Sequence, residues 1–496
     1  MSLVSAVPAP ATLRSVLRSP RALSTEVLAG IVTTLALIPE VISFSVIAGV
    51  DPQVSLLASV VLAVSMSFLG GRPAMITAAA GSVALVVGPL VKTHGVEYLM
   101  PTIVLAGLVQ VAFGVFGLAR LMRFVPRSVM LGFVNGLGIL IFMAQVPHVL
   151  DLPPLGYAVF AVVLLIVVLL PRFTTVVPAP LVAIALATAA VVVFNWTIPD
   201  VAGEGTIGGP LPGLTALGVP VNVETLQLIW PTALSVAFVG LLETLLTAKV
   251  TDDLTETHSD KGRESWGLGV ANMLAAGWGG IGGCAMIGQT VVNVKLGRAR
   301  TRISTLVAGL FLLLLMTSLS EVMARIPMVA LAAVMMVVAV QTLNWHSVAP
   351  GTLRRMPVPE TLVMAVTIIA VVATGNLAVG VGIGVLLAMV LFARRVARVL
   401  VVRRNLHDDG ASVRYAVAGP LFFGSSNDLV EQFDYAEDPA HVVIDLSAAQ
   451  LWDASTIAAL DSVRDKYAKH GADVTVTGLD ERSSALDRRL SGFLKD

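Results

Sequence analysis

Two acidic residues stand inside long apolar runs of this 496-residue chain. Glu243 is flanked by leucines in the stretch GLLETLL, and Glu40 follows Pro39 in ALIPEVISF. An ionisable group in an apolar span is costly and marks a functional site by default. A buried carboxyl group takes up a proton more readily than one in water, so Glu243 is a candidate proton carrier. The alternative for Glu243 is a structural hydrogen bond to neighbouring helix backbone, and Glu40 is equally compatible with exposure to water.

The stretch GGIGGCAMIGQTVVN, from Gly279 to Asn293, interrupts an apolar region with four glycines in its first five residues. It predicts an irregular approach followed by a half-helix that begins between Cys284 and Gly288. A helix that begins inside a membrane has unpaired N–H groups and a positive dipole end at its start. Such backbone must be buried in protein or line a cavity. Two facing helix starts of this kind would bind a small anion.

The matching stretch is GGRPAMITAAAGSVALVVG, from Gly70 to Gly88, in which Pro73 precedes the expected helix. Proline is favoured at a helix start. The small side chains of Ala78, Ala79 and Ala80 would let a ligand reach the backbone. Close packing of helices through small residues is the alternative, and it explains the alanine run alone equally well. The glycine cluster with its polar tail favours the anion site.

The remaining reactive residues show no catalytic or metal-binding pattern. The single cysteine, Cys284, has no His, Asp or second Cys at metal-ligand spacing, and His94, His148 and His346 fall near the ends of apolar runs or in loops. The sequence contains no Ser-His-Asp set and no nucleotide-binding loop. It therefore predicts no enzyme activity, no cofactor and no metal.

The composition places these residues in a membrane protein. Hydrophobic residues make up 56% of the chain and charged residues 13%, whereas soluble domains contain about 25% charged residues. The mean hydropathy is +0.88. The formal net charge is zero, which gives no electrostatic support for a nucleic-acid partner.

Apolar runs between residues 26 and 401 predict a polytopic α-helical membrane protein with 14 spans. The runs lie at 26–48, 54–70, 75–91, 99–119, 128–147, 155–170, 178–195, 229–250, 265–280, 285–296, 302–320, 327–342, 360–375 and 378–401. With both termini cytoplasmic, only Lys92 and Arg325 among the loop cations fall outside, as the positive-inside rule requires. The short third and tenth runs hold corresponding places in two sets of seven, which favours 7+7 inverted repeats with the binding site at these segments.

The chain changes character after about Arg404. The strand-like stretches VRYAVAG, LFFG, HVVIDL and DVTVTGL alternate with the helix-like stretches SNDLVEQF and ASTIAALDSVRDKYAKHG, which predicts a soluble α/β domain. The predicted domains are a cytoplasmic segment at 1–25, a membrane domain at 26–402 and an α/β domain at 403–496. The two repeats of the membrane domain are expected at about 26–200 and 225–402.

Three stretches carry a resemblance to a known family. GLLETLLTAKVTDDLT, GLGVANMLAAGWGGIGGCAMIGQTVVNVKLGRARTRIS and HVVIDLSAAQLWDASTIAALDSV, in this order, resemble the sulfate permease (SulP) family of anion transporters and exchangers. The resemblance covers nearly the whole chain and is most specific from Leu242 to Ser304. It implies a core domain of spans one to four and eight to eleven and a gate domain of the other spans. It also implies elevator-like movement of core against gate, a C-terminal STAS domain and a homodimer.

The resemblance also assigns a site by position. The anion would lie between the third and tenth spans, beside the first and eighth, which gives the candidate substrate-binding residues Glu40, Phe44, Ala78, Ala79, Ala80, Met286, Ile287, Gly288, Gln289 and Thr290. Glu243 is the acid of the eighth span and the candidate proton-coupling residue. In the C-terminal domain, Ser455 matches a serine that is phosphorylated in related regulatory domains. The alternative there is a helix N-cap formed by Asp453 or Ser455.

Two candidate positions depart from the family pattern. Gln289 stands where many members have arginine, and Glu40 where many have glutamine. Without that cation a permanently divalent, strongly hydrated anion such as sulfate is less well compensated. The expected substrate is bicarbonate, or a dicarboxylate that could span both half-helix dipoles. The sequence predicts proton-coupled symport of this anion across a bacterial inner (plasma) membrane. An anion exchanger, an uncoupled channel-like pathway and, less favoured, a nucleobase–proton symporter are the alternatives.

Overall fold

The computed structural model describes residues 13–150, 152–173, 178–205, 207, 209–406 and 411–493. Residues 1–12 of the predicted segment 1–25 lie outside these ranges. The chain forms two compact units, residues 1–385 and residues 386–496, and the boundary falls within helix α18 (Leu377–Ala397). Each unit is described by itself.

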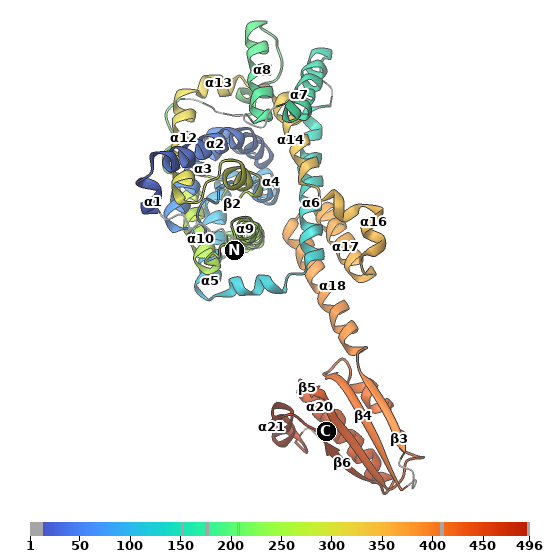
Figure 1. Cartoon of the computed structure of the whole chain (residues 1–496). Coiled ribbons are helices and arrows are strands. Elements are labelled where there is room, and N and C mark those ends of the chain that lie inside the picture. The colour runs from blue at the N-terminus through green and yellow to red at the C-terminus, as the bar shows by residue number, and fades with distance from the viewer. Residues whose placement is uncertain are drawn as a thin grey trace, which may run out of the picture. The chain divides into compact units, whose positions relative to one another are not determined.

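The first unit is built almost entirely of helices (Figure 1). Its elements in chain order are α1 (Leu13–Leu17), α2 (Pro20–Ala48), α3 (Pro52–Leu69), β1 (Thr77–Ala79), α4 (Gly81–His94), α5 (Leu99–Val115), α6 (Arg127–Gln145), α7 (Pro154–Phe173), α8 (Ala179–Val193), α9 (Val223–Thr255), α10 (Lys261–Ala276), β2 (Gly283–Ala285), α11 (Ile287–Val291), α12 (Arg302–Ser318), α13 (Ser320–Ala324), α14 (Met328–Thr342), α15 (Trp345–Val348), α16 (Pro350–Arg355), α17 (Val358–Thr374) and α18. A wider π-helical turn, Val292–Leu296, continues α11.

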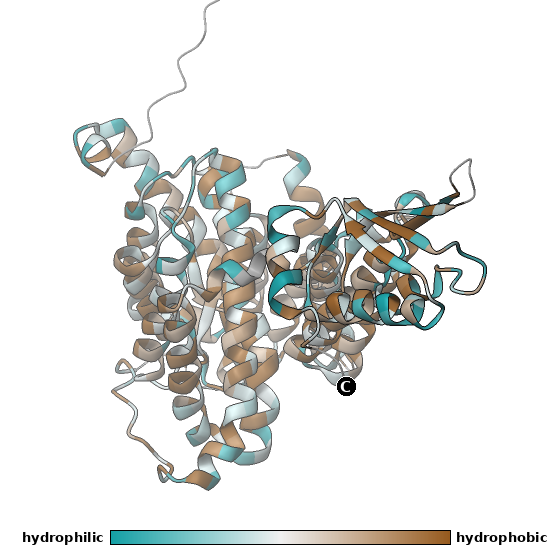
Figure 2. Ribbon diagram, turned by 90° about the horizontal axis from the view of Figure 1, so that it is seen from below, coloured by the Kyte–Doolittle hydropathy of each residue, from teal (hydrophilic) through white to brown (hydrophobic). Residues whose placement is uncertain are grey.

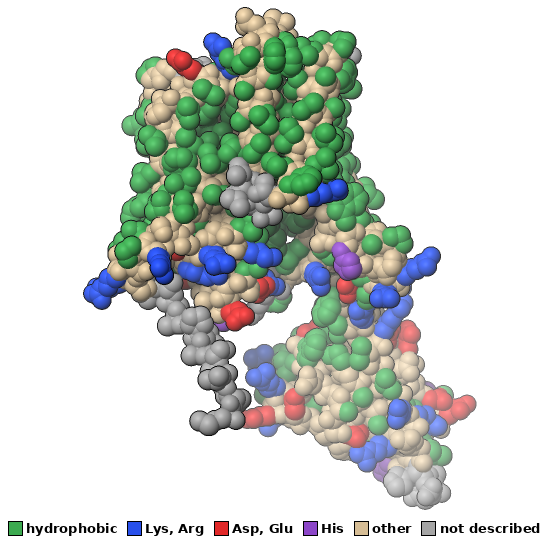
Figure 3. Space-filling model, turned by 45° about the horizontal axis from the view of Figure 1, so that its top comes forward, with side chains coloured by type: hydrophobic (Ala, Val, Ile, Leu, Met, Phe, Trp, Pro, Cys, Tyr) green, Lys and Arg blue, Asp and Glu red, His purple; other side chains and the backbone are tan. Residues whose placement is uncertain are grey.

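Several of these helices have the length and the apolar composition of membrane-spanning helices. Within the described residues, seven helices are long and apolar enough to cross one, and four shorter apolar helices accompany them. Each of the fourteen predicted runs contains a helix, but the number of crossings stays a prediction. Hydrophobic residues predominate along the helices (Figure 2), and on the face shown in Figure 3 Lys and Arg gather along one margin of the helical unit.

The helices pack in two groups. Helices α2, α3, α4, α5, α9, α10 and α12 contact one another, and α6, α7, α8, α14 and α17 form the second group. Helix α18 joins the second group because Gly380 and Gly384 lie against Val371 and Thr367 of α17. These groups contain the helices that the family resemblance assigns to the core and the gate, and they are called core helices and gate helices below.

Glycines set the closest approach among the core helices. A Cβ atom on Gly269 of α10 would lie 2.4 Å from the carbonyl oxygen of Gly107 in α5, and a Cβ on Gly107 would lie 2.6 Å from the carbonyl oxygen of Gly269. Because lipid offers helices no hydrophobic drive to associate, close backbone packing through small residues takes its place. The pair therefore fixes α10 against α5.

The second unit is an α/β domain with a four-stranded sheet in the order β3-β4-β5-β6. Its strands are β3 (Val401–Leu406), β4 (Ser412–Leu421), β5 (His441–Leu451) and β6 (Asp473–Thr477), and its helices are α19 (Ser426–Glu431), α20 (Ala454–Lys469) and α21 (Glu481–Leu490). Strands β3 and β4 are antiparallel, and the other two pairs are parallel. The N–H of Ser447 and the Arg414 guanidinium hold the pKa of Asp445, in β5, below its usual range.

The structure corrects two details of the predicted C-terminal domain. The stretch LFFG is not a separate strand, because Leu421 ends β4 and a turn follows. Strand β3 was not predicted at all. It begins at the end of the last predicted span, and its residues are mostly exposed, so it lacks the apolar alternation that marks a half-buried strand.

Candidate functional site

Two short strands bring the predicted half-helices together. Strand β1 pairs with β2 in antiparallel register, with Ala78 opposite Cys284. Each strand leads directly into a helix, α4 after β1 and α11 after β2. Because the strands run in opposite directions, the two helices start at opposite ends of the pair. The predicted start of the second half-helix is confirmed at Ile287.

The predicted start of the first half-helix is wrong. Pro73 lies in a turn, and extended residues separate it from α4, which begins at Gly81. Ala78 and Ala79 belong to β1, and Ala80 is the N-cap residue of α4. The backbone near the candidate site is therefore that of a strand pair as well as of helix starts.

Polar side chains from the core helices complete the hydrogen bonding of the strand pair. Asn272 of α10 accepts from the Gly283 N–H at 2.8 Å and donates to the Gly283 carbonyl at 3.1 Å. Thr244 and Thr247 of α9 bond the N–H and the carbonyl of Ala285 at 3.0 and 3.1 Å. A strand edge without such partners is not tolerated in a membrane interior.

On the other strand, the Ala79 N–H donates to Ser59 of α3 at 3.1 Å. The sequence analysis did not identify Ser59, Thr244, Thr247 or Asn272. The available signal was the same as for Glu243, namely a polar residue within an apolar run.

The starts of α4 and α11 present free backbone donors. The N-cap residues Ala80 and Met286 form no side-chain cap. The first bonds within the helices run from the Ala84 N–H to Ala80 and from the Thr290 N–H to Met286. The three N–H groups ahead of each bond carry the positive end of the helix dipole, so the arrangement favours a negative charge beside them.

Glu243 joins the two segments at this point. Its carboxylate accepts a hydrogen bond from the Ser82 hydroxyl in the first turn of α4 and one from the Cys284 thiol of β2 at 3.0 Å. Glu243 keeps part of its surface exposed. The partners of the carboxyl group are thus side chains of the two half-helix segments and not the backbone of its own helix.

The two candidate residues of α2 face the two helix starts. Phe44 is buried, and its ring packs on Gly81, where a Cβ atom would lie 2.5 Å from the ring. One turn earlier on the same face of α2, the partly exposed Glu40 interacts with the side-chain amide of Gln289. Helix α2 therefore touches α4 through Phe44 and α11 through Glu40.

The other candidates in α11 differ in what they face. Gly288 is exposed, and a Cβ atom there would meet open space, so the helix start borders a void at this residue. Ile287 is partly exposed, whereas Met286 and Thr290 are buried. The Thr290 hydroxyl accepts from the Ile76 N–H at 3.0 Å, which ties α11 to the approach to β1.

An ion-pair cluster that the sequence analysis did not identify holds the same approach from its other end. Arg72 lies 3.1 Å from Asp252 of α9, and the N–H groups of Gly71 and Arg72 donate to Glu264 of α10 at 2.6 and 2.8 Å. These bonds fix the loop between α3 and β1 to two core helices. No group of His, Cys, Asp or Glu suited to a metal occurs among the described residues.

In the second unit, Asp453 caps α20. It accepts from the Thr456 N–H at 3.1 Å and from the Phe423 N–H at 2.7 Å. Ser455 is exposed in the first turn and borders a groove of 580 Å³ between α19 and α20, next to Lys466. The capping role therefore belongs to Asp453, and the Ser455 hydroxyl is accessible.

Comparison with known families covers most of the chain. Residues 23–166 and 154–367 match the Sulfate permease family, and residues 404–495 match the STAS domain. A Bacillus subtilis protein named "Putative sulfate transporter YbaR" is 46% identical over 94% of this chain and 96% of its own length. The "Bicarbonate transporter BicA" of Synechocystis is 25% identical over 88% of this chain and 84% of its own length.

Solved structures show the same fold. The chain superposes on murine Slc26a9, an anion transporter in the inward-facing state, with a TM-score of 0.80 at 16% identity over 94% of this chain and 87% of that one. The transmembrane domain of a cyanobacterial BicA gives a TM-score of 0.64 at 24% identity over 74% of this chain and 97% of that one.

Proposed function

This chain belongs to the sulfate permease family of anion transporters, which are not enzymes, and we propose that it carries a small anion by proton-coupled symport. The supporting observation is the position of Glu243, whose carboxyl group contacts Ser82 at one half-helix start and Cys284 beside the other. The anion would bind to the free N–H groups of these starts, at Gly81 and near Gly288.

Repulsion between the Glu243 carboxylate and the anion would couple anion binding to proton binding. An ionised Glu243 places its own negative charge next to the helix start that would bind the anion, and like charges at such distances repel strongly in a poorly solvated site. A proton on Glu243 removes this repulsion, so proton and anion bind together. Elevator-like movement of the core helices against the gate helices would then expose the loaded site to the other side of the membrane.

The side chains around the site favour a singly charged or an elongated anion. No Lys or Arg belongs to the candidate set, and Gln289 is occupied with Glu40. A bicarbonate needs only one charge compensated, and a dicarboxylate could extend from one helix start towards the other. The name of the BicA relative supports bicarbonate and the name of the YbaR relative supports sulfate, so sulfate belongs in the test.

The wider arrangement is part of the same proposal. The protein would lie in the inner membrane of a bacterium as a homodimer, with both termini in the cytoplasm. The margin rich in Lys and Arg in Figure 3 supports the orientation, because short cytoplasmic loops carry an excess of these residues. The exposed Ser455 would serve as a phosphorylation site that regulates the STAS domain.

The test is uptake by the full-length protein in proteoliposomes. Labelled bicarbonate, fumarate, succinate, sulfate and uracil are each offered with and without an inward proton gradient. Uptake of one anion that increases with external acid supports the proposal. Uptake only against internal anion would make the protein an exchanger, flux independent of the gradient and far above transporter rates a channel, and uracil uptake a nucleobase symporter.

A further inference from the structure

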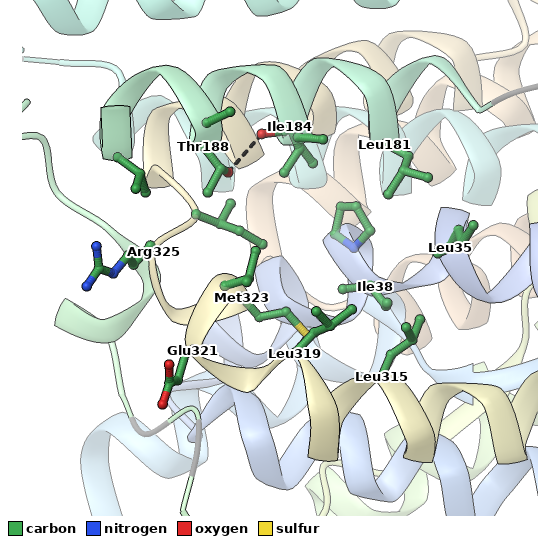
Figure 4. Close-up of a pocket in the computed structure, with 16 residues that line it drawn as sticks. Leu35, Ile38, Leu181, Ile184, Thr188, Leu315, Leu319, Glu321, Met323 and Arg325 are labelled. Atoms are coloured by element: carbon green, nitrogen blue, oxygen red, sulfur yellow. Dashed lines mark hydrogen bonds between the residues drawn. The ribbon is translucent and has the colours of Figure 1, made fainter. Parts of the chain in front are cut away.

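A cavity lies between core and gate helices, and none of the residues of β1 or β2 line it. It has a volume of 580 Å³, within the range of about 300–1,000 Å³ that ligand pockets occupy, and residues of α2, α8, α12 and α13 line it. Figure 4 shows Leu35 and Leu181 at one end and Glu321 and Arg325 at the other. We call this cavity the α2–α8 crevice.

The wall of the crevice is apolar along most of its length. The hydroxyl of Thr188, a polar group on α8, donates to the Ile184 carbonyl at 2.8 Å and so needs no other partner. Water gains little from such a wall, because an ordered water molecule needs several polar partners. A hydrocarbon chain fits the wall better, and the surrounding bilayer supplies such chains.

The charged end of the crevice favours an occupant with a polar headgroup over a bare hydrocarbon chain. Glu321 and Arg325 are both exposed, and the described ion pairs include none between them. One carboxylate and one guanidinium at the same end of the crevice complement a headgroup that carries both an ammonium and a phosphate. Arginine in particular matches phosphate through its planar fork of donors.

We propose that the α2–α8 crevice binds a zwitterionic phospholipid of the phosphatidylethanolamine type. One acyl chain lies along the apolar wall between α2 and α8, the phosphate pairs with Arg325 and the ammonium pairs with Glu321. The polar end and the apolar length of the crevice thus match the two parts of a single lipid molecule.

A bound lipid would affect transport through its contact with α2. Ile38 and Pro39 line the crevice, and Glu40 of the candidate anion site follows directly in the chain. Helix α2 is a core helix and α8 is a gate helix, so a bound acyl chain contacts both moving parts. This consequence rests on the proposed function, whereas lipid binding itself does not.

The test measures lipid retained by the purified full-length protein, by native mass spectrometry in a mild detergent after exposure to equal amounts of phosphatidylethanolamine and phosphatidylglycerol. Ala185→Trp places an indole in the crevice, and Ala185 is exposed, so the packed interior is not overfilled. Leu186→Trp is the matched control, because Leu186 is 54% exposed on the same helix and does not line the crevice. The wild type and Leu186→Trp should retain one phosphatidylethanolamine that Ala185→Trp loses.

A second variant tests the headgroup without changing the wall. The double substitution Glu321→Ala and Arg325→Ala should abolish the preference for phosphatidylethanolamine over phosphatidylglycerol. Equal retention by wild type and Ala185→Trp, or an unchanged preference in the double variant, would overturn the proposal. Because retention is measured without any transported solute, it fails or succeeds independently of the proposed anion symport.

Discussion

Replacing Glu243 with glutamine tests the coupling most directly. The substitution removes the charge but keeps the shape of the side chain and one oxygen that can accept from Ser82 or Cys284. Glutamine and glutamate have similar helix propensities, so α9 should fold normally. In its binding properties the variant should imitate wild-type protein whose Glu243 is permanently protonated.

The size of the effect follows from the position of the carboxylate. An anion on the N–H groups of Gly81 and Ser82 would lie roughly 6 Å from a carboxylate that Ser82 touches, and at an effective dielectric constant of about 20 the repulsion is about 3 kcal/mol, or roughly 100-fold in affinity. Wild-type affinity should therefore fall by up to this factor as pH rises and Glu243 ionises. The affinity of Glu243→Gln should stay at the acid value at every pH.

The assay has two parts. Equilibrium binding of the labelled anion is measured against pH, and accumulation in proteoliposomes is measured with an inward proton gradient. Glu243→Gln should bind without pH dependence and should only equilibrate the anion, never concentrate it. Glu224→Gln, an exposed acid in the first turn of the same helix, is the control and should behave as wild type. Gradient-driven accumulation by Glu243→Gln, or pH-independent binding by the wild type, would refute the reasoning.

Three further predictions concern packing, the strand pair and the C-terminal domain. Gly81→Ala should displace the Phe44 ring, with an overpacking cost of about 1–3 kcal/mol, and should reduce uptake. Replacing the ring with the smaller leucine side chain, in Gly81→Ala/Phe44→Leu, should restore part of the lost uptake, and no recovery would contradict this contact. Asn272→Ala leaves a buried N–H and a buried carbonyl unpaired, at about 1–3 kcal/mol each, so it should lower the thermal unfolding midpoint in detergent, and a midpoint equal to wild type would show that another group replaces the amide. The folded pKa of Asp445 lies below its unfolded value, so its charge stabilises the domain above about pH 3.9, and this stabilisation is lost as pH falls through the folded pKa. In denaturant titrations, the difference in unfolding free energy between wild type and Asp445→Asn should therefore shrink over that interval. A difference that does not change with pH would contradict this role of Asp445.

Patterns with a strong physical cause were predictable from the sequence. The apolar runs located every helix of the two groups, because a helix in lipid must be apolar over most of its length. The start of α11 was predictable because Gly279 and Gly282, both with positive φ, interrupt the preceding run. Glu243 stood out because a charge in such a run is rare.

The paired strands were not predictable, because three residues are too few for a period of two to be recognised. Thr77 to Ala79 run into alanines that also suit a helix, and Gly283 to Ala285 lie in a glycine cluster that predicts irregular backbone, whereas the pairing of the two segments makes both extended. Pro73 gave a misleading helix signal because distant residues, Asp252 and Glu264, fix the turn that it occupies. The partners of Glu243 likewise come from segments far away in the chain.

The β1–β2 pairing has a consequence for how the protein is made. The two strands are more than two hundred residues apart in the chain, so the ribosome completes the first half long before β2 exists. Until then the pairing groups of β1 have no partner strand, and hydrocarbon cannot substitute for one. The segment around β1 therefore needs water or protein around it until then, and the candidate anion site forms only when β2 is inserted. Neither half made alone would hold the complete candidate site, which therefore forms late in assembly.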